Sequence, residues 1–459
     1  MKNFMAWIEK FILPVATKIG TEKHLIALRD AFITTLPATM AGSIAVLLNA
    51  FLRDFPSDFG WIRFVELMEP IITINGYVWA GTTAVMAVIF ATTLGYNLAK
   101  AYDVDPLAGA IVSLAAFLMG LTQTATSTLE LSEALPQDTI NLIVEAGGTV
   151  IDGTQVTANA WGYFNFGAHM GGAGLFTAIF FGLISTLIYA KLMLKKITIK
   201  MPAAVPPAVA KAFAAIIPAL VALYVIGIIN YGFYQVTGQA VIDWISETIQ
   251  TPLLHLSQGF GAVLIIVFLV HTLWFFGLHG TNILAPVLLS IYGTAMNDNM
   301  NAYQLGEAIP WNWTAASFDV FVWPGGAGVT LMLIVALLLF SRRADSKTVA
   351  KLALAPGVFN INEPVMFGLP IVLNPLYMIP YILAPMATAT LSYAATLLGL
   401  VNPVVVNVIW VMPAGISGFL ATGGDWRAVI LTLMNLIVAF LIWAPFVMAA
   451  NKVTPINHD

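Results

Sequence analysis

The sequence lacks cysteine altogether and contains few charged residues. None of its 459 residues is cysteine, and only 9% are Asp, Glu, Lys or Arg. Because a soluble domain carries about 25% charged residues, this shortage excludes a soluble globular protein. Without cysteine the chain can form no disulfide, no thiolate metal site and no cysteine nucleophile. The net charge of -4 is too small to suggest a nucleic-acid partner, and we expect neither a metal ion nor a cofactor.

Hydrophobic residues make up 59% of the chain, and its mean hydropathy is +0.88. About 20 apolar residues are needed to cross the hydrocarbon core of a membrane. By this criterion the predicted spans are 31–52, 77–98, 106–125, 171–194, 212–236, 258–278, 321–341, 376–399 and 427–450. Two shorter apolar segments with prolines, 282–293 and 402–422, fit either short crossings or re-entrant hairpins. We therefore predict an all-α polytopic membrane protein with about ten transmembrane helices, re-entrant hairpins and interfacial amphipathic helices.

The first residues have the pattern of an amphipathic helix. Apolar side chains occupy one face and mostly charged ones the other: Phe4, Trp7, Ile8, Phe11 and Val15 against Lys2, Glu9, Lys10 and Lys18. This spacing predicts an interfacial helix that lies on the membrane, and a helix packed on the protein's own cytoplasmic surface is the alternative. We expect no signal peptide, because the first long apolar run starts near residue 31 and no cleavage site follows a short apolar core.

The basic residues predict the orientation in the membrane. Most of them can be placed on one side: Lys10, Lys18, Lys23, Arg29, Lys100, Lys191, Lys195, Lys196, Lys200, Arg342, Arg343, Lys347 and Lys351. This leaves only Arg53, Arg63 and Arg427 of the 19 basic residues on the other side. Cytoplasmic loops are rich in Lys and Arg, so we expect both termini in the cytoplasm. Lys452 supports this placement for the C-terminus. Residues 126–170 carry acidic residues and no Lys or Arg, which favours an external loop.

Irregular segments concentrate in the C-terminal half. The orientation requires the chain to cross the membrane within 279–320, where no plain apolar helix of sufficient length occurs. The same difficulty recurs at 355–375 and 402–422. We therefore predict two parts: a scaffold at 1–240, which carries the contact between subunits, and a substrate-binding transport half at 241–459.

Glu363 is the strongest candidate for a functional residue. It lies in the apolar stretch Phe359–Pro375, where Pro364, Pro370 and Gly368 prevent an undisturbed helix. Broken backbone at membrane depth is tolerated where it lines a cavity, and an ionisable residue there is a binding-site hypothesis by default. The alternative is a carboxylate that is paired or neutralised to stabilise an irregular turn.

Other polar and aromatic residues near the predicted breaks complete a candidate site. His279 ends one span, and the alternative for it is a helix-end histidine satisfied by backbone. The further candidates for substrate contact are Asn360, Asn362, Asn282 and Trp410. Some of these amides are expected only to satisfy broken backbone, and tryptophan is common at membrane interfaces. A carboxylate, a histidine, amides and aromatic rings describe a sugar site better than an ion site, because each buried sugar hydroxyl needs a partner.

These motifs resemble a known family. Asn360-Ile361-Asn362-Glu363-Pro364 leads into Phe367-Gly368-Leu369-Pro370, and Trp274-Phe275-Phe276-Gly277-Leu278-His279-Gly280 lies upstream. Together they resemble the membrane C component (EIIC permease) of the lactose/cellobiose/diacetylchitobiose family of the bacterial phosphoenolpyruvate-dependent sugar phosphotransferase system. The segments around Lys23–Phe32 and Gly418–Trp426 are also similar to that family.

The resemblance implies a homodimer in a bacterial cell membrane, with re-entrant hairpins in the C-terminal half and an elevator-like movement of the bound sugar. It places Glu363 and His279 at the sugar hydroxyl that is phosphorylated, and it matches Trp410 more loosely as a stacking platform. The phosphate would come from a phosphocysteine of a B component, which an A component supplies. Because this chain has no cysteine, we expect the B component to be a separate protein.

The leading hypothesis is transport of a β-linked disaccharide of the cellobiose, diacetylchitobiose or lactose type, coupled to its phosphorylation. The chain alone would catalyse nothing and would be the membrane subunit of a protein-phosphocysteine–sugar phosphotransferase complex. The alternative is a proton-coupled secondary sugar transporter, in which Glu363 carries the proton. No nucleotide-binding Walker sequence is present to energise transport.

Overall fold

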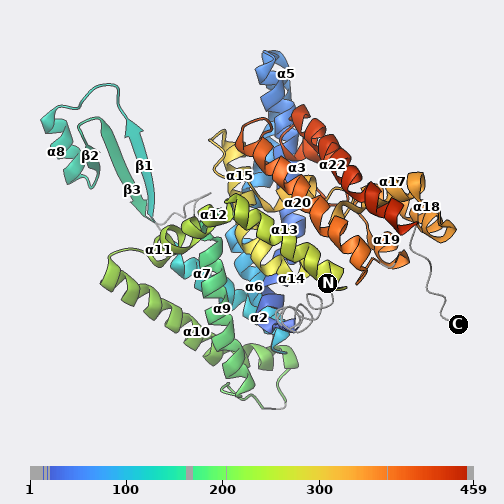
Figure 1. Ribbon diagram of the computed structural model, residues 1–459. Helices are drawn as coiled ribbons and strands as arrows, with labels where there is room; N and C mark the ends of the chain where they lie inside the picture. The colour runs from blue at the N-terminus through green and yellow to red at the C-terminus, as the bar shows by residue number, and fades with distance from the viewer. Residues whose placement is uncertain are drawn as a thin grey trace.

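The computed structural model describes residues 14, 18, 21–122, 124–161, 169–202, 204–369 and 371–451. The described chain is mostly helical, and one small sheet with helix α8 stands apart from the other helices (Figure 1). The predicted interfacial helix at 4–18 lies, apart from Pro14 and Lys18, outside the described residues.

The N-terminal part consists mainly of long apolar helices. Its elements outside the sheet are α2 (Lys23–Thr34), α3 (Leu36–Asn49), η1 (Ala50–Asp54), α4 (Phe55–Asp58), α5 (Ile62–Ala80), η2 (Thr83–Val85), α6 (Met86–Ala101), α7 (Pro106–Gly120), η3 (Gly172–Gly174), α9 (Leu175–Leu194) and α10 (Pro207–Thr237). Helices α6, α7 and α9 pack on one another around buried Phe90 and Phe117. Gly95 of α6 and Gly109 of α7 let two of these backbones approach closely.

The C-terminal part is more broken. Its elements are α11 (Val241–Ile245), η4 (Ser246–Gln250), α12 (Thr251–Ser257), α13 (Phe260–Phe275), α14 (Gly280–Val287), η5 (Leu288–Gly293), α15 (Thr294–Leu305), α16 (Ala315–Ser317), η6 (Phe318–Val322), η7 (Ala327–Val329), α17 (Thr330–Phe340), α18 (Ala344–Val358), α19 (Glu363–Gly368), α20 (Pro375–Leu397), α21 (Ile416–Ala421) and α22 (Trp426–Ala450). Its largest core lies among α13, α17, α20 and α22, where Tyr381 and Trp443 are fully buried.

The predicted helical membrane class is confirmed. By length and composition, 6 helices in the described residues could cross a membrane: Lys23–Asp58, Ile62–Ala101, Gly172–Leu194, Pro207–Thr237, Ala315–Phe340 and Trp426–Ala450. The count rises to 7 if Val241–Ser257 and Phe260–Phe275, which meet at a bend of 75°, form one span. The remaining predicted spans, 106–125 and 376–399, coincide with helices α7 and α20.

The predicted irregular segments differ in how they are built. The chain from Gly280 to Leu305 is helical, and its irregularity is a π-helical turn, η5, that follows Pro286. By contrast, the backbone leaves the helix at 359–362 and between Gly399 and Gly415. These breaks expose backbone groups that side chains must satisfy.

The all-helical prediction missed one small sheet. Strands β1 (Thr124–Glu130), β2 (Thr149–Ile151) and β3 (Gln155–Trp161) form an antiparallel sheet in the order β1-β3-β2, beside helix α8 (Gln137–Glu145). Asp152 and Gly153, both with positive φ, lie in the turn between β2 and β3. An Asp-Gly pair between β-prone residues is a strong hairpin signal, which the interpretation of 126–170 as a plain loop overlooked.

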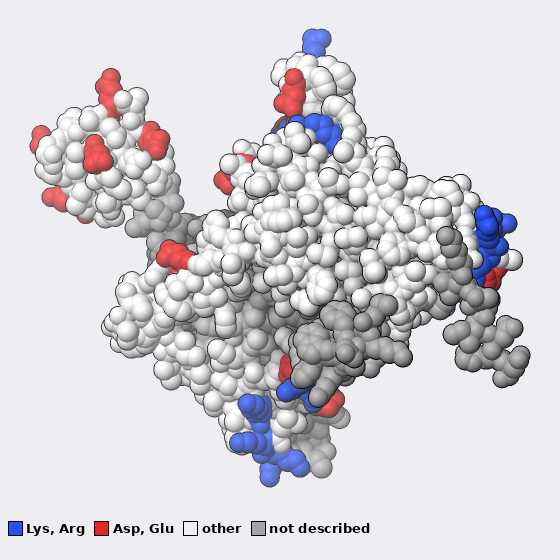
Figure 2. All heavy atoms as spheres, in the orientation of Figure 1, with Lys and Arg blue, Asp and Glu red and all other residues white. Residues whose placement is uncertain are grey.

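Charged side chains are unevenly distributed over the surface. Figure 2 shows Lys and Arg near the lower end of α9, over the α17–α18 region and around α5, whereas the charged residues of the sheet unit are acidic. The predicted orientation of the chain in the membrane stays a prediction.

The close approach of α6 and α7 gives a stability prediction. A Cβ at Gly95 would lie 2.4 Å from the Gly109 carbonyl oxygen, which belongs to backbone and cannot move aside cheaply. We expect Gly95→Ala to lower the free energy of unfolding by ~1–3 kcal/mol through overpacking. Thermal unfolding of the detergent-solubilised protein measures this effect.

Gly76→Ala is the matched control, because Gly76 is also helical and a Cβ there meets nothing within 4 Å. This control should leave the melting temperature unchanged or slightly raised. Equal melting temperatures for the Gly95 variant and the control would contradict the described contact.

Candidate functional site

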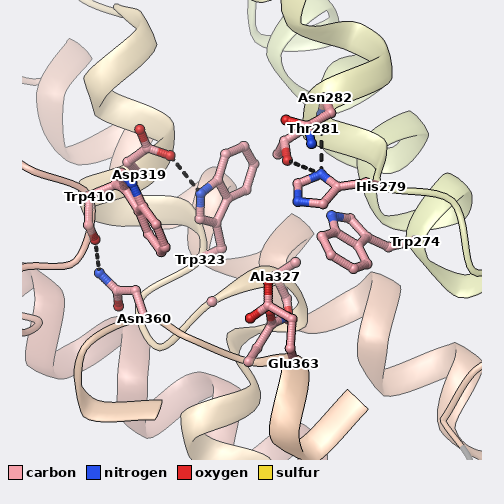
Figure 3. Close-up of a pocket in the computed structure, with 12 residues that line it drawn as sticks. Trp274, His279, Thr281, Asn282, Asp319, Trp323, Ala327, Asn360, Glu363 and Trp410 are labelled. Carbon is pink, nitrogen blue, oxygen red and sulfur yellow. Dashed lines mark hydrogen bonds between the residues drawn. The ribbon is translucent and has the colours of Figure 1, made fainter. Parts of the chain in front are cut away.

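A cavity of about 350 Å³ lies within the C-terminal part of the chain (Figure 3). Its volume falls in the range of small-molecule binding sites. It is lined by Trp274, His279, Thr281, Asn282, Asp319, Trp323, Gly326, Ala327, Asn360, Asn362, Glu363 and Trp410. The structure therefore brings all the residues proposed from the sequence, Glu363, His279, Asn282, Asn360, Asn362 and Trp410, to one cavity.

His279 is placed by the tight connection between α13 and α14. Helix α13 ends with Gly277 at φ 77°, and the amides of Gly277 and Leu278 bond back to Trp274 and Leu273. This is the usual glycine-terminated end of a helix. The chain then turns into α14, with Gly280 packed directly against the backbone of α13. His279 is thereby fixed as the N-cap residue of α14.

The hydrogen bonds of His279 define the state of its ring. Its Nδ1 accepts from the Asn282 amide at 3.3 Å and from the Thr281 hydroxyl at 3.0 Å. An amide N–H can only donate, so Nδ1 carries no proton and Nε2 carries one in the neutral ring. Figure 3 shows the second ring nitrogen on the side of the imidazole that faces the cavity. His279 thus caps a helix and presents an N–H donor to the cavity.

Glu363 is the first residue of helix α19, directly after the break at 359–362. Proline follows at a first-turn position, where its missing N–H costs little. A carboxylate is favoured at a helix N-terminus by the unpaired amides there. Among the described residues Glu363 has no hydrogen-bond partner or ion pair, and its side chain points into the cavity (Figure 3). Its carboxylate oxygens remain available to a ligand.

Asn360 lines the cavity, but its amide is engaged with backbone. Its Nδ2 donates to the carbonyl oxygens of Trp410 at 2.5 Å and Met412 at 3.0 Å. Its Oδ1 accepts from the Gly325 amide at 2.6 Å. The side chain therefore ties three separate segments together and has no N–H left for a ligand.

The two other asparagines differ from each other. Asn362 is buried, and its Nδ2 donates to the Ala327 carbonyl oxygen at 3.2 Å, so it too holds backbone. The Asn282 side chain is exposed and has no hydrogen-bond partner among the described residues. Of the amides proposed from the sequence, Asn282 is the one whose side chain has no hydrogen-bond partner among the described residues.

Three tryptophans form apolar walls of the cavity. The rings of Trp274 and His279 are in contact, with centroids 4.2 Å apart. Trp323 stands deeper, stacked on Phe318 at 5.5 Å, and Trp410 lies across the cavity from His279 (Figure 3). Their faces can cover the apolar side of a sugar ring while polar groups between them bind its hydroxyls.

Asp319 was missed in the sequence. It lies on the π-helical turn η6 and lines the cavity, where its Oδ1 accepts from Trp323 Nε1 at 2.9 Å. The signal was present, because Asp319 is the only charged residue between Glu307 and Arg342. A charge in such an apolar run marks a functional candidate in the same way that Glu363 does. Trp323 also lines the cavity and was not proposed from the sequence as a substrate contact.

The fold and the cavity define a membrane transport protein for a small polar solute, since hydrogen-bonding groups and aromatic walls meet inside a bundle of apolar helices. The chain belongs to the EIIC family of the phosphotransferase system: residues 29–385 match the family described as "Phosphotransferase system, EIIC". It is therefore a sugar permease of a bacterial phosphotransferase system and a multi-pass membrane protein.

Individual relatives agree with this assignment. The chain is 44% identical to the "PTS system cellobiose-specific EIIC component" of Lactococcus lactis subsp. lactis (strain IL1403), over 88% of this chain and 89% of the relative. It is 35% identical to the "PTS system oligo-beta-mannoside-specific EIIC component" of Bacillus subtilis (strain 168), over 86% of this chain and 82% of that relative. Among solved structures it matches the transporter ChbC, "the IIC component from the N,N'-diacetylchitobiose-specific phosphotransferase system", with a TM-score of 0.86, 35% identity and coverage of 97% and 98%.

The two roles of His279 can be separated by substitution. Asparagine is a good N-cap residue, so His279→Asn keeps the cap of α14 but removes the N–H that faces the cavity. His279→Ala removes both, and loss of the cap costs about 1 kcal/mol. We expect both variants to bind sugar more weakly and only the alanine variant to melt at a lower temperature. Thermal unfolding and equilibrium sugar binding measure the two effects.

Wild-type sugar binding in His279→Asn would mean that the imidazole acts only as a helix cap. Lowered stability in both variants alike would show that the asparagine does not replace the cap, and the binding result would then be read against the stability loss.

Proposed function

We propose that this permease carries a β-linked disaccharide of the cellobiose type into the cell, where the sugar is phosphorylated as it is released. The observation that carries the proposal is the meeting of Glu363, His279, Asp319 and three tryptophan faces in one cavity. The specificities named for the relatives, cellobiose, oligo-β-mannoside and diacetylchitobiose, support a β-linked substrate for this chain as well.

We assign the free polar atoms of the cavity to the sugar. Glu363 accepts a hydrogen bond from the hydroxyl that becomes phosphorylated, and His279 Nε2–H donates to the same region. Asn282 can donate and accept beside them. Asp319, which uses one oxygen for Trp323, has its second oxygen for a hydroxyl of the other ring. This division follows from which atoms lack partners within the described chain.

The phosphate donor lies outside these residues. The chain has no cysteine, so the phosphocysteine implied by the family must belong to a B component, itself supplied by an A component. Phosphoryl transfer requires the donor, the phosphorus and the accepting hydroxyl to come nearly in line. A cytosolic donor can meet the sugar only when the cavity opens to the cytoplasm.

We propose the same two functional parts that the sequence predicts. Residues 1–240 form a scaffold that also provides the contact in a homodimer, and 241–459 form the half that moves the sugar. All the residues that line the cavity fall in the second range, whereas α6, α7 and α9 pack on one another in the first. The basic loops support cytoplasmic positions for both termini.

Proteoliposomes test the function directly. They would contain the purified chain, with A and B components and phosphoenolpyruvate on the side that represents the cytoplasm, and cellobiose on the other. We expect cellobiose phosphate to appear only when all components are present. Accumulation of free cellobiose in response to a proton gradient would instead support the proton-coupled alternative.

Glu363→Gln is the first test of the site. The change keeps the size of the side chain but removes the negative charge that accepts from sugar hydroxyls. A hydrogen bond to a charged group contributes about 1.5–3 kcal/mol, so we expect cellobiose affinity to fall roughly ten- to a hundredfold. Equilibrium binding to the purified variant measures this, and wild-type affinity would remove Glu363 from the site.

The basic segment 342–351, which joins α17 to α18 and includes the start of α18, is proposed as the surface that attracts the B component. It contains Arg342, Arg343, Lys347 and Lys351. The Arg343 guanidinium donates to the Asp345 carboxylate at 3.0 Å and holds the pKa of that carboxyl below its usual value. The positive charge of Arg343 is therefore partly compensated. Among the described residues Lys347 and Lys351 form no ion pair, and they lie one turn apart on α18. These two lysines are therefore the better probes.

Reversal of both charges, Lys347→Glu with Lys351→Glu, should slow phosphorylation by the B component, because steering by opposite charges is lost. The effect should be larger at low salt, where steering is unscreened, while sugar binding stays unchanged. Initial phosphorylation rates across a salt series measure it.

The matched control is Lys191→Glu with Lys195→Glu, a second pair four residues apart at the end of α9. The control should behave as wild type. Equal rates for the α18 pair, the control and wild type at every salt concentration would leave the basic segment 342–351 as a topology signal only.

A further inference from the structure

The cavity wall that carries Trp410 is not part of a helix. Between Gly399 and Gly415 the backbone makes no helical turns long enough to hold itself in place. Its first part is anchored by several bonds: Asp425 accepts from the Asn402 amide, Asn299 donates to the Val404 carbonyl oxygen, and the amides of Val405 and Val406 donate to the Ala421 carbonyl oxygen. The part around Trp410 needs a separate anchor.

Asn360 supplies that anchor. Its two amide hydrogens reach the carbonyl oxygens of Trp410 and Met412. No other side chain outside 407–412 hydrogen-bonds to this stretch among the residues that the structure describes. Figure 3 shows the link between Asn360 and Trp410 at the edge of the cavity opposite His279.

The backbone at Asn360 explains why this residue can reach so far. It has φ 63° and ends α18, with its amide bonded to Gly357 and the Ile361 amide bonded to Pro356. Asparagine is the residue that most often replaces glycine at this left-handed helix end. The side chain is thereby turned away from α18 toward the Trp410 segment, and its oxygen also holds the Gly325 amide, two residues after Trp323.

We propose that Asn360 is a positioning residue that holds Trp410 over the cavity and so sets the affinity for the second ring of a disaccharide. The proposal rests on the function proposed above. Glu363 and His279 then hold the ring that is phosphorylated, and Trp410, on the opposite side, covers the other ring. Asn360 itself does not bind the sugar, because a sugar hydroxyl could accept from its amide only by displacing a backbone carbonyl.

Asn360→Gly tests this role, and it also removes the bond that the side chain accepts from the Gly325 amide. Glycine adopts the left-handed conformation without strain, so the end of α18 is preserved while the side-chain anchor is removed. Asp103→Gly is the matched control, because Asp103 also has a positive φ, 55°, but lies between α6 and α7, away from the cavity.

Binding to the purified full-length chain is measured with two probes, cellobiose and the single-ring methyl β-glucoside. We expect Asn360→Gly to bind cellobiose about tenfold more weakly, which corresponds to the net contribution of one or two hydrogen bonds. It should bind methyl β-glucoside as tightly as the wild type does. The Asp103 control should match wild type for both. Equal losses for the two probes would overturn the assignment to the second ring.

A double-mutant cycle asks whether Asn360 acts through Trp410. Trp410→Ala alone and Trp410→Ala combined with Asn360→Gly should bind cellobiose equally weakly, because the anchor has nothing left to position. Additive losses would mean that Asn360 acts independently of Trp410, and the proposal would be wrong.

A second measurement does not depend on the sugar. Because the chain has no cysteine, Met412→Cys provides a unique thiol in the anchored stretch, where Met412 is half-buried. We expect a maleimide to label this thiol several-fold faster when Asn360 is glycine than when it is asparagine. Unchanged labelling would overturn the anchoring role. Absence of cellobiose binding in the wild type would instead overturn the proposed substrate, while the labelling result would still decide the anchor.

Discussion

Backbone groups that leave a helix inside an apolar environment must find hydrogen-bond partners, and this requirement shapes the C-terminal part of the chain. Buried asparagines meet it repeatedly. Asn299 donates to the carbonyl oxygens of Trp311 and Val404 and accepts from the Trp311 amide. Asn435 likewise donates to the Phe321 carbonyl oxygen. Each of these amides replaces bonds that a continuous helix would have made, so the breaks that open the cavity are possible only because such side chains lie beside them.

The same requirement separates two kinds of residue at the cavity. Asn360 and Asn362 line it, yet their amides hold backbone of neighbouring segments. Glu363 and His279 Nε2 lack protein partners in the described chain, and Asp319 uses one oxygen only. Residues of the first kind fix the positions of the walls, and residues of the second kind are free to bind a ligand. Lining a cavity is therefore weaker evidence for ligand contact than an unsatisfied polar atom within it.

The sequence predicts which residues line this cavity, because a charge among apolar residues and proline at a helix break are local signals. Glu363 stands out for this reason, and Asp319 carries the same signal although it was overlooked. The hydrogen-bond partners of the amides cannot be predicted from local sequence. The carbonyl oxygen that Asn360 contacts belongs to a segment some fifty residues later in the chain. The sheet unit was missed for a different reason, since the Asp152–Gly153 hairpin signal was outweighed by the acidic composition of its surroundings.

The charges of the cavity also bear on what can leave it. Glu363 and Asp319 line the cavity, and no lysine or arginine is among its described lining residues. Two carboxylates without a basic partner favour a neutral polyol, because its hydroxyls can donate to them. They disfavour a phosphate ester, because both carboxylates repel its negative charge. Transfer of a phosphoryl group to the bound sugar would convert a well-matched ligand into a poorly matched one at the moment when the cavity opens to the cytoplasm. On the proposed function, the acidic lining would therefore both hold the incoming sugar and promote release of the phosphorylated product.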